Sequence, residues 1–219
     1  SLQPNEIYIH QFQSFSPNML KTFEQCPKRF EFKYIKNISM PVNDEIFEKG
    51  KNIHALASYY LRNENIDKME KALKPDEFEV WNYLKKCEYF SYKVINTEYN
   101  LSVKIGEIFF GGRLDALVKK DDTYYILDYK TGSAPKNAKF DYQTMIYLLC
   151  VKEFFKTYNV IFVYLDLKNK QETKIELSEN LVKEFEEKLL TISKKIQKKD
   201  FIANKKSNFC PCEYNIICY

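Results

Sequence analysis

Two short segments near the middle of the chain carry the side chains best suited to chemistry. Asp115 closes a Gly-Gly-Arg-Leu-Asp run, and Asp128 and Lys130 lie in an Asp-Tyr-Lys-Thr-Gly run. Carboxylate oxygens are the ligands that hard divalent cations such as Mg²⁺ prefer. A lysine beside them supplies a compact, mobile positive charge. The three residues therefore predict a divalent-metal site.

The residues between these segments predict the hairpin that positions them. Asp121-Asp122 reads as a two-residue turn between two strands. With that turn, Asp115 lies directly opposite Asp128, and their Cβ atoms are roughly 5 Å apart on one face. Lys130 comes two residues after Asp128 and shares the face. Two acids this close repel each other unless a positive charge lies between them.

Simpler interpretations of the hairpin are open from the pattern alone. The two acids could form a solvent-exposed pair, with Lys130 as their salt-bridge partner. The alternate face carries apolar Leu114, Ala116 and Leu127, so neither face is plainly exposed. The register could also slip by one residue or bulge at Gly111-Gly112, and either change would separate the acids.

Composition limits the class of protein without naming a function. The chain has 219 residues, 45% of them apolar and 16% aromatic, which suits one domain, with or without a small appendage. A net charge of +4 permits a nucleic-acid partner and indicates nothing more. No apolar run is long enough for a membrane span or a signal core, so we expect a cytoplasmic protein. The first residues are Ser-Leu rather than Met, which favours a piece excised from a longer protein or a cloning scar.

Hydrophobic periodicity predicts an α/β fold of the mixed α+β kind. Helices are expected from Ser16-Pro17, from Pro27, over 44–61, from Pro75, over 140–155 and over 182–196, and strands over 94–105, 107–119, 123–130, 160–167 and 173–177. This order predicts a mixed sheet with flanking helices. We expect one domain over 1–219, with a helical part at 14–93, a sheet core at 94–177 and a helix plus cysteine tail at 178–219.

Ordered motifs along the chain resemble those of the PD-(D/E)XK nuclease superfamily, and most closely its RecB/AddB/Cas4-like branch. Besides the two segments above, they are the Ser16–Tyr34 segment, the Gly50–His54 run, Gln143 with Tyr147 four residues on, and the C-terminal cysteines. The matches span residues 14–218. The resemblance implies a restriction-endonuclease-like core whose central mixed sheet is flanked by helices, with a helical N-terminal insertion and a cysteine-bearing C-terminal tail.

The resemblance also implies an activity, the hydrolysis of DNA phosphodiester bonds with Mg²⁺ or Mn²⁺. The metal ligands that it implies are His54, Asp115, Asp128 and the backbone carbonyl of Tyr129. Lys130 would position the attacking water and stabilise charge on the phosphate, and Gln143 and Tyr147 would line the site. A carboxylate-held metal acts as Lewis acid and template, so no covalent nucleophile is required. Exonuclease action is expected.

Each assigned residue also has an ordinary structural interpretation. His54 alone is typical of a hydrogen-bonded core histidine, and Gln143 and Tyr147 could be polar tips of a packed helix. Glu98 could support the metal ligands, although a surface glutamate is the simpler interpretation. A non-catalytic DNA-binding module that keeps the fold is the alternative function. The expected partners are DNA and either a helicase subunit or domain, in DNA repair and recombination, or CRISPR adaptation proteins.

Four cysteines form a second candidate site. The resemblance implies that Cys26, Cys210, Cys212 and Cys218 bind a 4Fe–4S cluster that joins the two ends of the nuclease. The spacing Cys-x-Cys-x5-Cys departs from the family pattern, which has two residues within the first pair. Four thiolates suit zinc equally well, and free thiols are a third possibility. Cys87 and Cys150 are expected on helices in the core.

Overall fold

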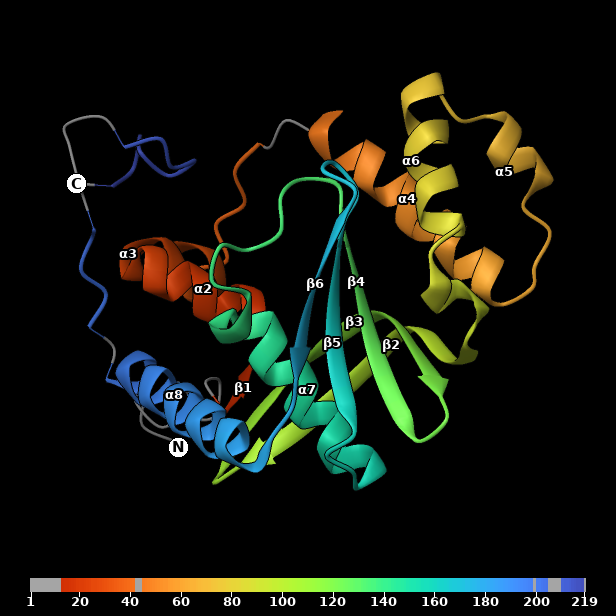
Figure 1. Cartoon of the computed structure of the whole chain (residues 1–219). Helices are drawn as coiled ribbons and strands as arrows, with labels where there is room; N and C mark the ends of the chain where they lie inside the picture. Colours follow the sequence, from red (N-terminus) through yellow and green to blue (C-terminus); the bar gives the residue numbers. More distant parts are fainter. Residues whose placement is uncertain (1–12, 42–44, 199, 205–209, 219) are drawn as a thin grey trace, which may run out of the picture.

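The central sheet carries helices on both of its faces (Figure 1). This computed structural model describes residues 13–41, 45–198, 200–204 and 210–218, with the backbone alone for 45–49. The mixed α/β class predicted from the sequence is confirmed. Within the described residues, no helix is both long and apolar enough to cross a membrane.

The strands form one mixed sheet. They are β1 (Ser14–Phe15), β2 (Lys93–Ile105), β3 (Ile108–Lys120), β4 (Thr123–Lys130), β5 (Val160–Asp166) and β6 (Gln171–Glu176). Their order is β1-β3-β4-β5-β6, and β2 pairs with β3. The β1–β3 and β4–β5 pairs are parallel and the other pairs are antiparallel. The three central strands begin and end close to the predicted positions.

The helices pack on this sheet in two groups. They are α2 (Pro17–Gln25), α3 (Pro27–Phe30), α4 (Glu45–Leu61), α5 (Asp67–Lys71), α6 (Pro75–Lys85), α7 (Tyr142–Phe155) and α8 (Glu179–Gln197), with shorter turns η1 (Glu31–Ile35), η2 (Glu88–Ser91) and η3 (Ala138–Phe140). One apolar cluster joins α2, α7 and α8 to one face of the sheet. A second joins α4 and α6 to the other face.

The β3–β4 hairpin has the predicted register. Its pairs run from Lys120–Thr123 to Ala116–Leu127, and Asp121 takes a left-handed conformation with φ 52° in the turn. Aspartate tolerates this conformation because its short side chain bonds locally to the backbone. Asp115 and Asp128 are the next residues after the last pair, where the two strands separate. The one-residue slip considered above is therefore wrong.

Gly111 and Gly112 do not form a bulge. They continue the β2–β3 ladder opposite Ser102 and Leu101, and the irregularity in this pair lies between Val94 and Asn96. The glycines instead allow close approach. A Cβ on Gly111 would lie 2.5 Å from the carbonyl oxygen of Leu101. A side chain at this position would therefore push β2 away from β3.

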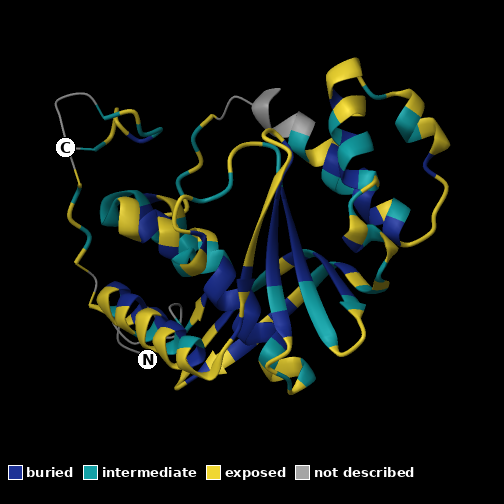
Figure 2. Cartoon of the chain, in the orientation of Figure 1, coloured by how far each residue is buried: buried dark blue, intermediate teal, exposed yellow. Residues whose placement is uncertain are grey.

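The helix that follows the hairpin is buried on nearly every side (Figure 2). It begins at Tyr142 rather than Phe140, because the Asp141 side chain accepts a hydrogen bond from the backbone N–H of Gln143 and caps the helix. Phe140 lies in η3. A helix buried on nearly every side is a core element, so its buried polar side chains need partners inside the protein.

Other local predictions are confirmed or corrected by the structure. The Ser16 hydroxyl caps α2, with Pro17 at the first helical position. The apolar stripe predicted over 182–196 is the buried face of α8. Cys150 is buried in α7, whereas Cys87 lies between α6 and η2 rather than on a helix. Residue 44, where one predicted helix started, lies outside the described residues.

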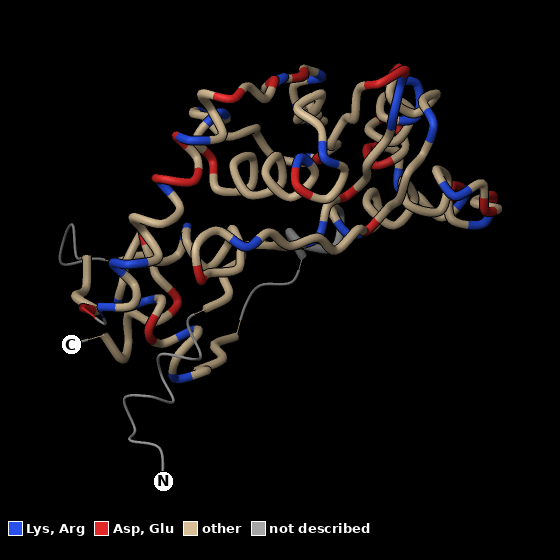
Figure 3. Tube along the Cα trace, turned by 90° about the horizontal axis from the view of Figure 1, so that it is seen from below, with Lys and Arg blue, Asp and Glu red and all other residues tan. Residues whose placement is uncertain are grey.

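Charged residues of both signs alternate along the chain trace (Figure 3). In this view no large region carries lysine and arginine alone. This distribution agrees with the small net charge of +4. Any recognition of an anionic partner must therefore come from a local arrangement rather than from the field of the whole molecule.

Candidate active site

The helix α4 brings His54 to the end of the hairpin. His54 Nδ1 lies 2.6 Å from the carbonyl oxygen of Gly50, one turn earlier, and Nε2 lies 3.1 Å from Asp115 Oδ2. Burial alone would lower the pKa of His54. The hydrogen bond and the charge of Asp115 outweigh it and raise the pKa to about 9. The imidazole is therefore protonated at neutral pH in the metal-free protein.

Asp115 is fixed where β3 leaves β4. Its Oδ2 accepts a hydrogen bond of 2.8 Å from the backbone N–H of Tyr129 in addition to the contact with His54. The ring of Tyr129 lies beneath α4, with its centroid 5.4 Å from that of His54. The carboxylate therefore connects the two strands after their backbone pairing has ended.

Asp128 lies deeper than Asp115. It is 5% exposed, which contradicts the solvent-exposed pair considered above. Burial and then the charge of Asp115 raise its pKa to about 7, against the opposing effect of Lys130. A carboxyl group buried beside a like charge holds its proton until a cation compensates.

Lys130 connects β4 to α7. Its Nζ lies 3.0 Å from Asp128 Oδ2 and donates a hydrogen bond of 2.9 Å to Gln143 Oε1. The contact with Asp128 is an ion pair by distance, but Asp128 Oδ2 forms no hydrogen bond of acceptable geometry within the described structure. A buried carboxylate oxygen therefore lacks a full partner at the centre of the site.

Tyr147 packs over the glycines of β3. A Cβ on Gly112 would lie 2.7 Å from the Tyr147 hydroxyl, so the absence of a side chain there makes room for the phenol. Burial, followed by the charge of Asp128, raises the pKa of Tyr147 to about 12. The structure thus places Gln143 and Tyr147, four residues apart on α7, on the same side of the sheet as Asp128.

A cavity of about 700 Å³ opens beside Asp115. Another cavity, of about 760 Å³, lies away from this site, between α2, α7 and α8. His54 and Asp115 line the first one, together with Glu98 of β2 and Arg113 of β3. Arg113 Nε lies 2.9 Å from Glu98 Oε2. The first cavity belongs to the candidate site because Asp115 and His54 line it, while Asp128 lies buried behind Asp115.

Sequence reasoning favoured a surface position for Glu98 and assigned nothing to Arg113. The β2–β3 pairs on either side, Thr97–Ala116 and Tyr99–Leu114, place Glu98 opposite Asp115. The sequence feature that could have predicted this pairing is a second two-residue turn at 106–107, where Gly106 has φ 59°. Had this turn been read like the one at Asp121-Asp122, the register would have brought Glu98 to the site.

The donor chemistry fits a divalent cation, although the donors are not gathered around one point. Among the described residues, no group of three or more histidine, cysteine or acidic side chains is arranged to hold a metal ion. Asp128 Oδ2 is buried without a hydrogen bond, and Asp115 is the nearby charge that raises its pKa. Both features would be relieved by a cation between the two carboxylates.

The four cysteines of the second predicted site lie at one end of the protein but do not converge. Cys26 precedes α3, and its Sγ accepts a long contact of 3.5 Å from the N–H of Asn204. The segment 210–218 docks on α3 and η1, where Glu213 Oε1 lies 2.9 Å from Arg29 Nη2. Burial raises the pKa of the Cys212 thiol. None of the described cysteines belongs to a metal-competent group.

Fold and site together define an α/β protein with paired acids and a lysine at the end of a central hairpin. The sequence profile of the PD-(D/E)XK nuclease superfamily matches residues 14–219. The chain therefore belongs to this superfamily.

One solved structure agrees with this fold, and a second gives a weaker match. The crystal structure of a "putative exonuclease" from Eubacterium rectale matches with a TM-score of 0.59 and 12% identity, over 97% of this chain and 92% of that chain. The crystal structure of SSO0001 matches with a TM-score of 0.43 and 16% identity, over 97% of this chain and 94% of that chain. No curated protein sequence matches this chain.

Proposed function

We propose that this protein hydrolyses DNA phosphodiester bonds with Mg²⁺ or Mn²⁺. The observation that carries the proposal is Asp128, a buried carboxylate that has an oxygen without a hydrogen bond and lies beside Asp115 and Lys130. The membership in a nuclease superfamily supports it. Lys130 does not offset the raised pKa of Asp128, and a divalent ion between the two acids is the simplest group that would do so.

The proposed metal ligands combine both strands and one helix. They are Asp115, Asp128, the backbone carbonyl of Tyr129 and, once it has released its proton, His54. When bound, the ion would supply Lewis acidity and a template for the phosphate. Because metal binding requires deprotonated ligands, loading at neutral pH should release protons from His54 and Asp128.

Lys130 is the residue that we assign to the attacking water and the phosphate. Gln143 accepts a hydrogen bond from its ammonium group and so fixes the direction of a long, flexible side chain. A positive charge held in this way stabilises negative charge that develops on the phosphoryl oxygens. Tyr147 would close the site on the side of α7, where it excludes water.

The test uses labelled linear DNA, single- and double-stranded, with Mn²⁺ or with EDTA. We expect cleavage with Mn²⁺, and a loss of at least about a hundredfold in the rate for Asp128→Asn and for Lys130→Ala. Asp122→Asn and Lys104→Ala are matched controls, because both residues are exposed and lie outside the site. Equal cleavage by all five proteins would refute the site assignment. Binding without cleavage by the wild type would favour the non-catalytic module.

Exonuclease action is the finer part of the proposal. An enzyme that needs a strand end should degrade linear DNA and leave a covalently closed circle of the same sequence intact. Cutting of the circle would instead show endonuclease action.

We also propose a setting for this activity. The protein acts either beside a helicase, as in RecB/AddB-type enzymes of repair and recombination, or alone, as in Cas4-like proteins. A helicase-linked nuclease should degrade more DNA when the helicase hydrolyses ATP.

We also propose that Cys26, Cys210, Cys212 and Cys218 bind a 4Fe–4S cluster. The docking of segment 210–218 on the helix that follows Cys26 supports this proposal. The thiols would have to move together, since they do not form a metal group in the described residues. A brown protein that loses its visible absorbance on Cys212→Ser would support the cluster. A colourless protein that contains zinc would favour the zinc alternative.

A further inference from the structure

A groove continues from Asp115 and His54 along one face of α4. Within the 700 Å³ cavity that holds His54 and Asp115, this helix also contributes Lys51, Ala55, Ser58, Tyr59 and Arg62. Lys51, Ala55, Tyr59 and Arg62 follow one another at steps of three to four residues, so they form one stripe on the helix, with Ser58 beside it. The opposite wall carries Glu98 and Arg113. The groove is therefore continuous with two of the proposed metal ligands, His54 and Asp115.

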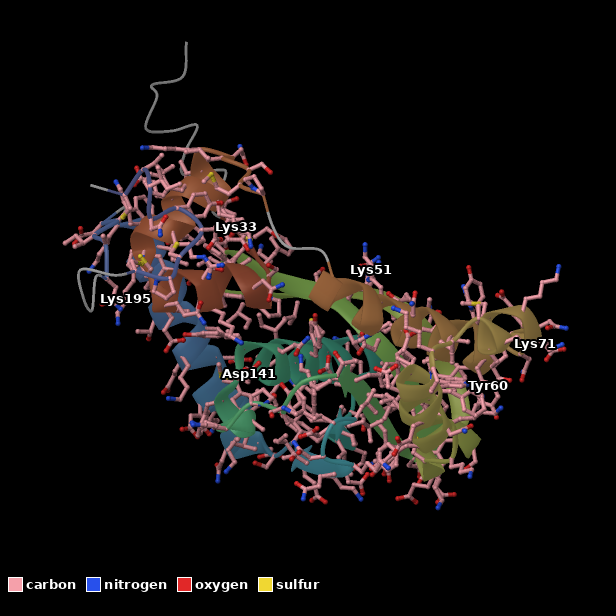
Figure 4. The ribbon with its side chains drawn as sticks, turned by 90° about the horizontal axis from the view of Figure 1, so that it is seen from above. Lys33, Lys51, Tyr60, Lys71, Asp141 and Lys195 are labelled. Atoms are coloured by element: carbon pink, nitrogen blue, oxygen red, sulfur yellow. The ribbon has the colours of Figure 1, made fainter. Side chains whose placement is uncertain are left out.

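Tyr59 is the aromatic residue in this groove. The residue is 38% exposed, and the guanidinium carbon of Arg62 lies 5.0 Å from its ring centroid. Its neighbour Tyr60 is used differently, because it packs against Trp81 of α6 in the core (Figure 4). An arginine on an aromatic face makes a flat, cationic surface of the kind on which nucleobases stack.

The groove also gathers positive charge. Lys51 extends from the first turns of α4 into solvent (Figure 4), and the Arg113 side chain is 64% exposed. With Arg62, which also pairs with Glu64 at 3.2 Å, they place cations on both walls of a cavity whose lining also includes the acids Glu98 and Asp115. Glu98 holds Arg113 in place at 2.9 Å. A phosphate group would find cationic partners on both walls.

We propose that this groove binds an unpaired nucleotide next to the scissile phosphate. Tyr59 stacks on the base, and Arg62 and Arg113 contact the flanking phosphates. The base must be unpaired, because the faces of a base within a duplex are already covered by its stacked neighbours. This inference rests on the proposed nuclease function and deepens it, since it names a strand with unpaired nucleotides as the substrate class.

The binding test does not require cleavage. An Asp128→Asn protein in EDTA is titrated into a short single-stranded oligonucleotide that carries 2-aminopurine, whose fluorescence is quenched when it stacks. We expect quenching, and about tenfold weaker binding for the additional change Tyr59→Ala. Tyr59→Phe should restore both signals because it keeps the ring. A blunt duplex should compete at least about tenfold less well than the single strand.

Matched controls separate stacking from general damage. Tyr158 is 44% exposed between α7 and β5, outside the groove, so Tyr158→Ala should bind like the parent. Arg113→Ala should reduce the slope of log affinity against log salt by about one, as expected for one lost phosphate contact. Unchanged affinity for Tyr59→Ala, or equal losses for Tyr59→Ala and Tyr158→Ala, would overturn the proposal.

The outcome is distinguishable from failure of the nuclease proposal. If the wild type cuts no DNA but quenching still depends on the Tyr59 ring, the nucleotide site stands and the catalytic assignment falls. If the wild type cuts DNA and Tyr59→Ala changes neither binding nor KM, the catalytic assignment stands and the nucleotide site falls. In an active enzyme we expect Tyr59→Ala to raise KM more than it lowers kcat, since Tyr59 does not touch the proposed metal ligands.

Discussion

At the scale of single residues, the two acids of the hairpin have different surroundings. Asp115 accepts hydrogen bonds from a backbone N–H and from His54, so its charge is compensated. Asp128 is buried, has an oxygen without a hydrogen bond, and has a pKa near 7. Carboxyl groups whose pKa is strongly shifted by burial and by a charged neighbour are frequent at functional sites. Here the difference arises because Asp115 lies beside His54 of α4, whereas Asp128 is buried on the α7 side with Lys130 and Tyr147.

The pKa of Asp128 predicts how the metal-free protein responds to pH. Its value in the folded state is raised from 3.8 to about 7, so the unfolded chain loses this proton first as the pH rises. The free energy of unfolding should therefore decrease as the pH rises from about 3.8 to about 7. Asp128→Asn removes this loss. We expect its Tm in EDTA to exceed that of the wild type by clearly more at about pH 8 than at about pH 5.

The control for this comparison is Asp122→Asn, at an exposed carboxylate on the same hairpin. It tests whether the loss of any carboxylate on this hairpin, rather than of the buried one, changes the Tm. His54 adds a second window of the same sign, because its pKa is raised from 6.5 to about 9. A Tm difference for Asp128→Asn that is equal at both pH values would show that the burial of this carboxyl group does not govern the response.

At the scale of elements, the close contact of β2, β3 and α7 depends on two glycines. A Cβ on Gly111 would meet the backbone of Leu101, which cannot move without opening the sheet. A Cβ on Gly112 would meet the Tyr147 hydroxyl, which can shift. The two adjacent positions therefore control different contacts, one between strands and one between the sheet and the helix.

These contacts predict an ordered series of stabilities. Gly111→Ala should lower the free energy of unfolding by about 1–3 kcal/mol. Gly112→Ala should cost less, and part of that cost should disappear in combination with Tyr147→Phe. Gly132→Ala is the control, because a Cβ there meets nothing within 4 Å, and it should stay within about 0.5 kcal/mol. Urea denaturation of the four variants and of the wild type measures these free energies of unfolding. A loss for Gly132→Ala equal to that for Gly111→Ala would contradict the explanation.

Most elements could be predicted because their signals are local. The Asp121 turn, the Ser16 cap and the apolar stripe of α8 each lie within a short window of sequence, and the structure has all three. The hairpin register followed from the turn, so the opposing acids could be placed from sequence. The groove could not be found in this way, since Tyr59 and Arg113 come together only when α4 packs beside the β2–β3 pair.

At the scale of the whole molecule, the last described segment docks on the first helices. The hydroxyl of Tyr214 donates a hydrogen bond of 2.8 Å to the carbonyl oxygen of Ile38, and its ring lies 5.4 Å from that of Phe32. Arg29 and Glu213 add an ion pair. No sequence window spans these partners, which explains why the docking contacts could not be predicted from local patterns.

This docking predicts a local effect on protease resistance. Tyr214 is 3% exposed, so Tyr214→Ala removes a buried ring and a hydrogen bond from the contact. We expect cleavage within 210–218 to become about tenfold faster or more, while the sheet core stays resistant. Limited proteolysis with mass spectrometry measures both. Tyr158→Ala is the matched control, and an identical cleavage rate for the two variants would show that Tyr214 does not hold the segment.

The backbone conformation of Glu98 predicts which residue selection should keep at this position. This residue has φ 48°, in the left-handed region, although it lies within β2 and is not a glycine. Such a conformation costs about 1 kcal/mol in every molecule, with or without a bound strand. Selection for heat resistance alone should therefore replace Glu98 with glycine, whereas selection for DNA degradation should keep the glutamate if its contact with Arg113 is needed. The experiment evolves one gene library separately under each of these two selections. The residue found at codon 98 in each population then shows whether the unfavourable backbone conformation of Glu98 is kept because of function.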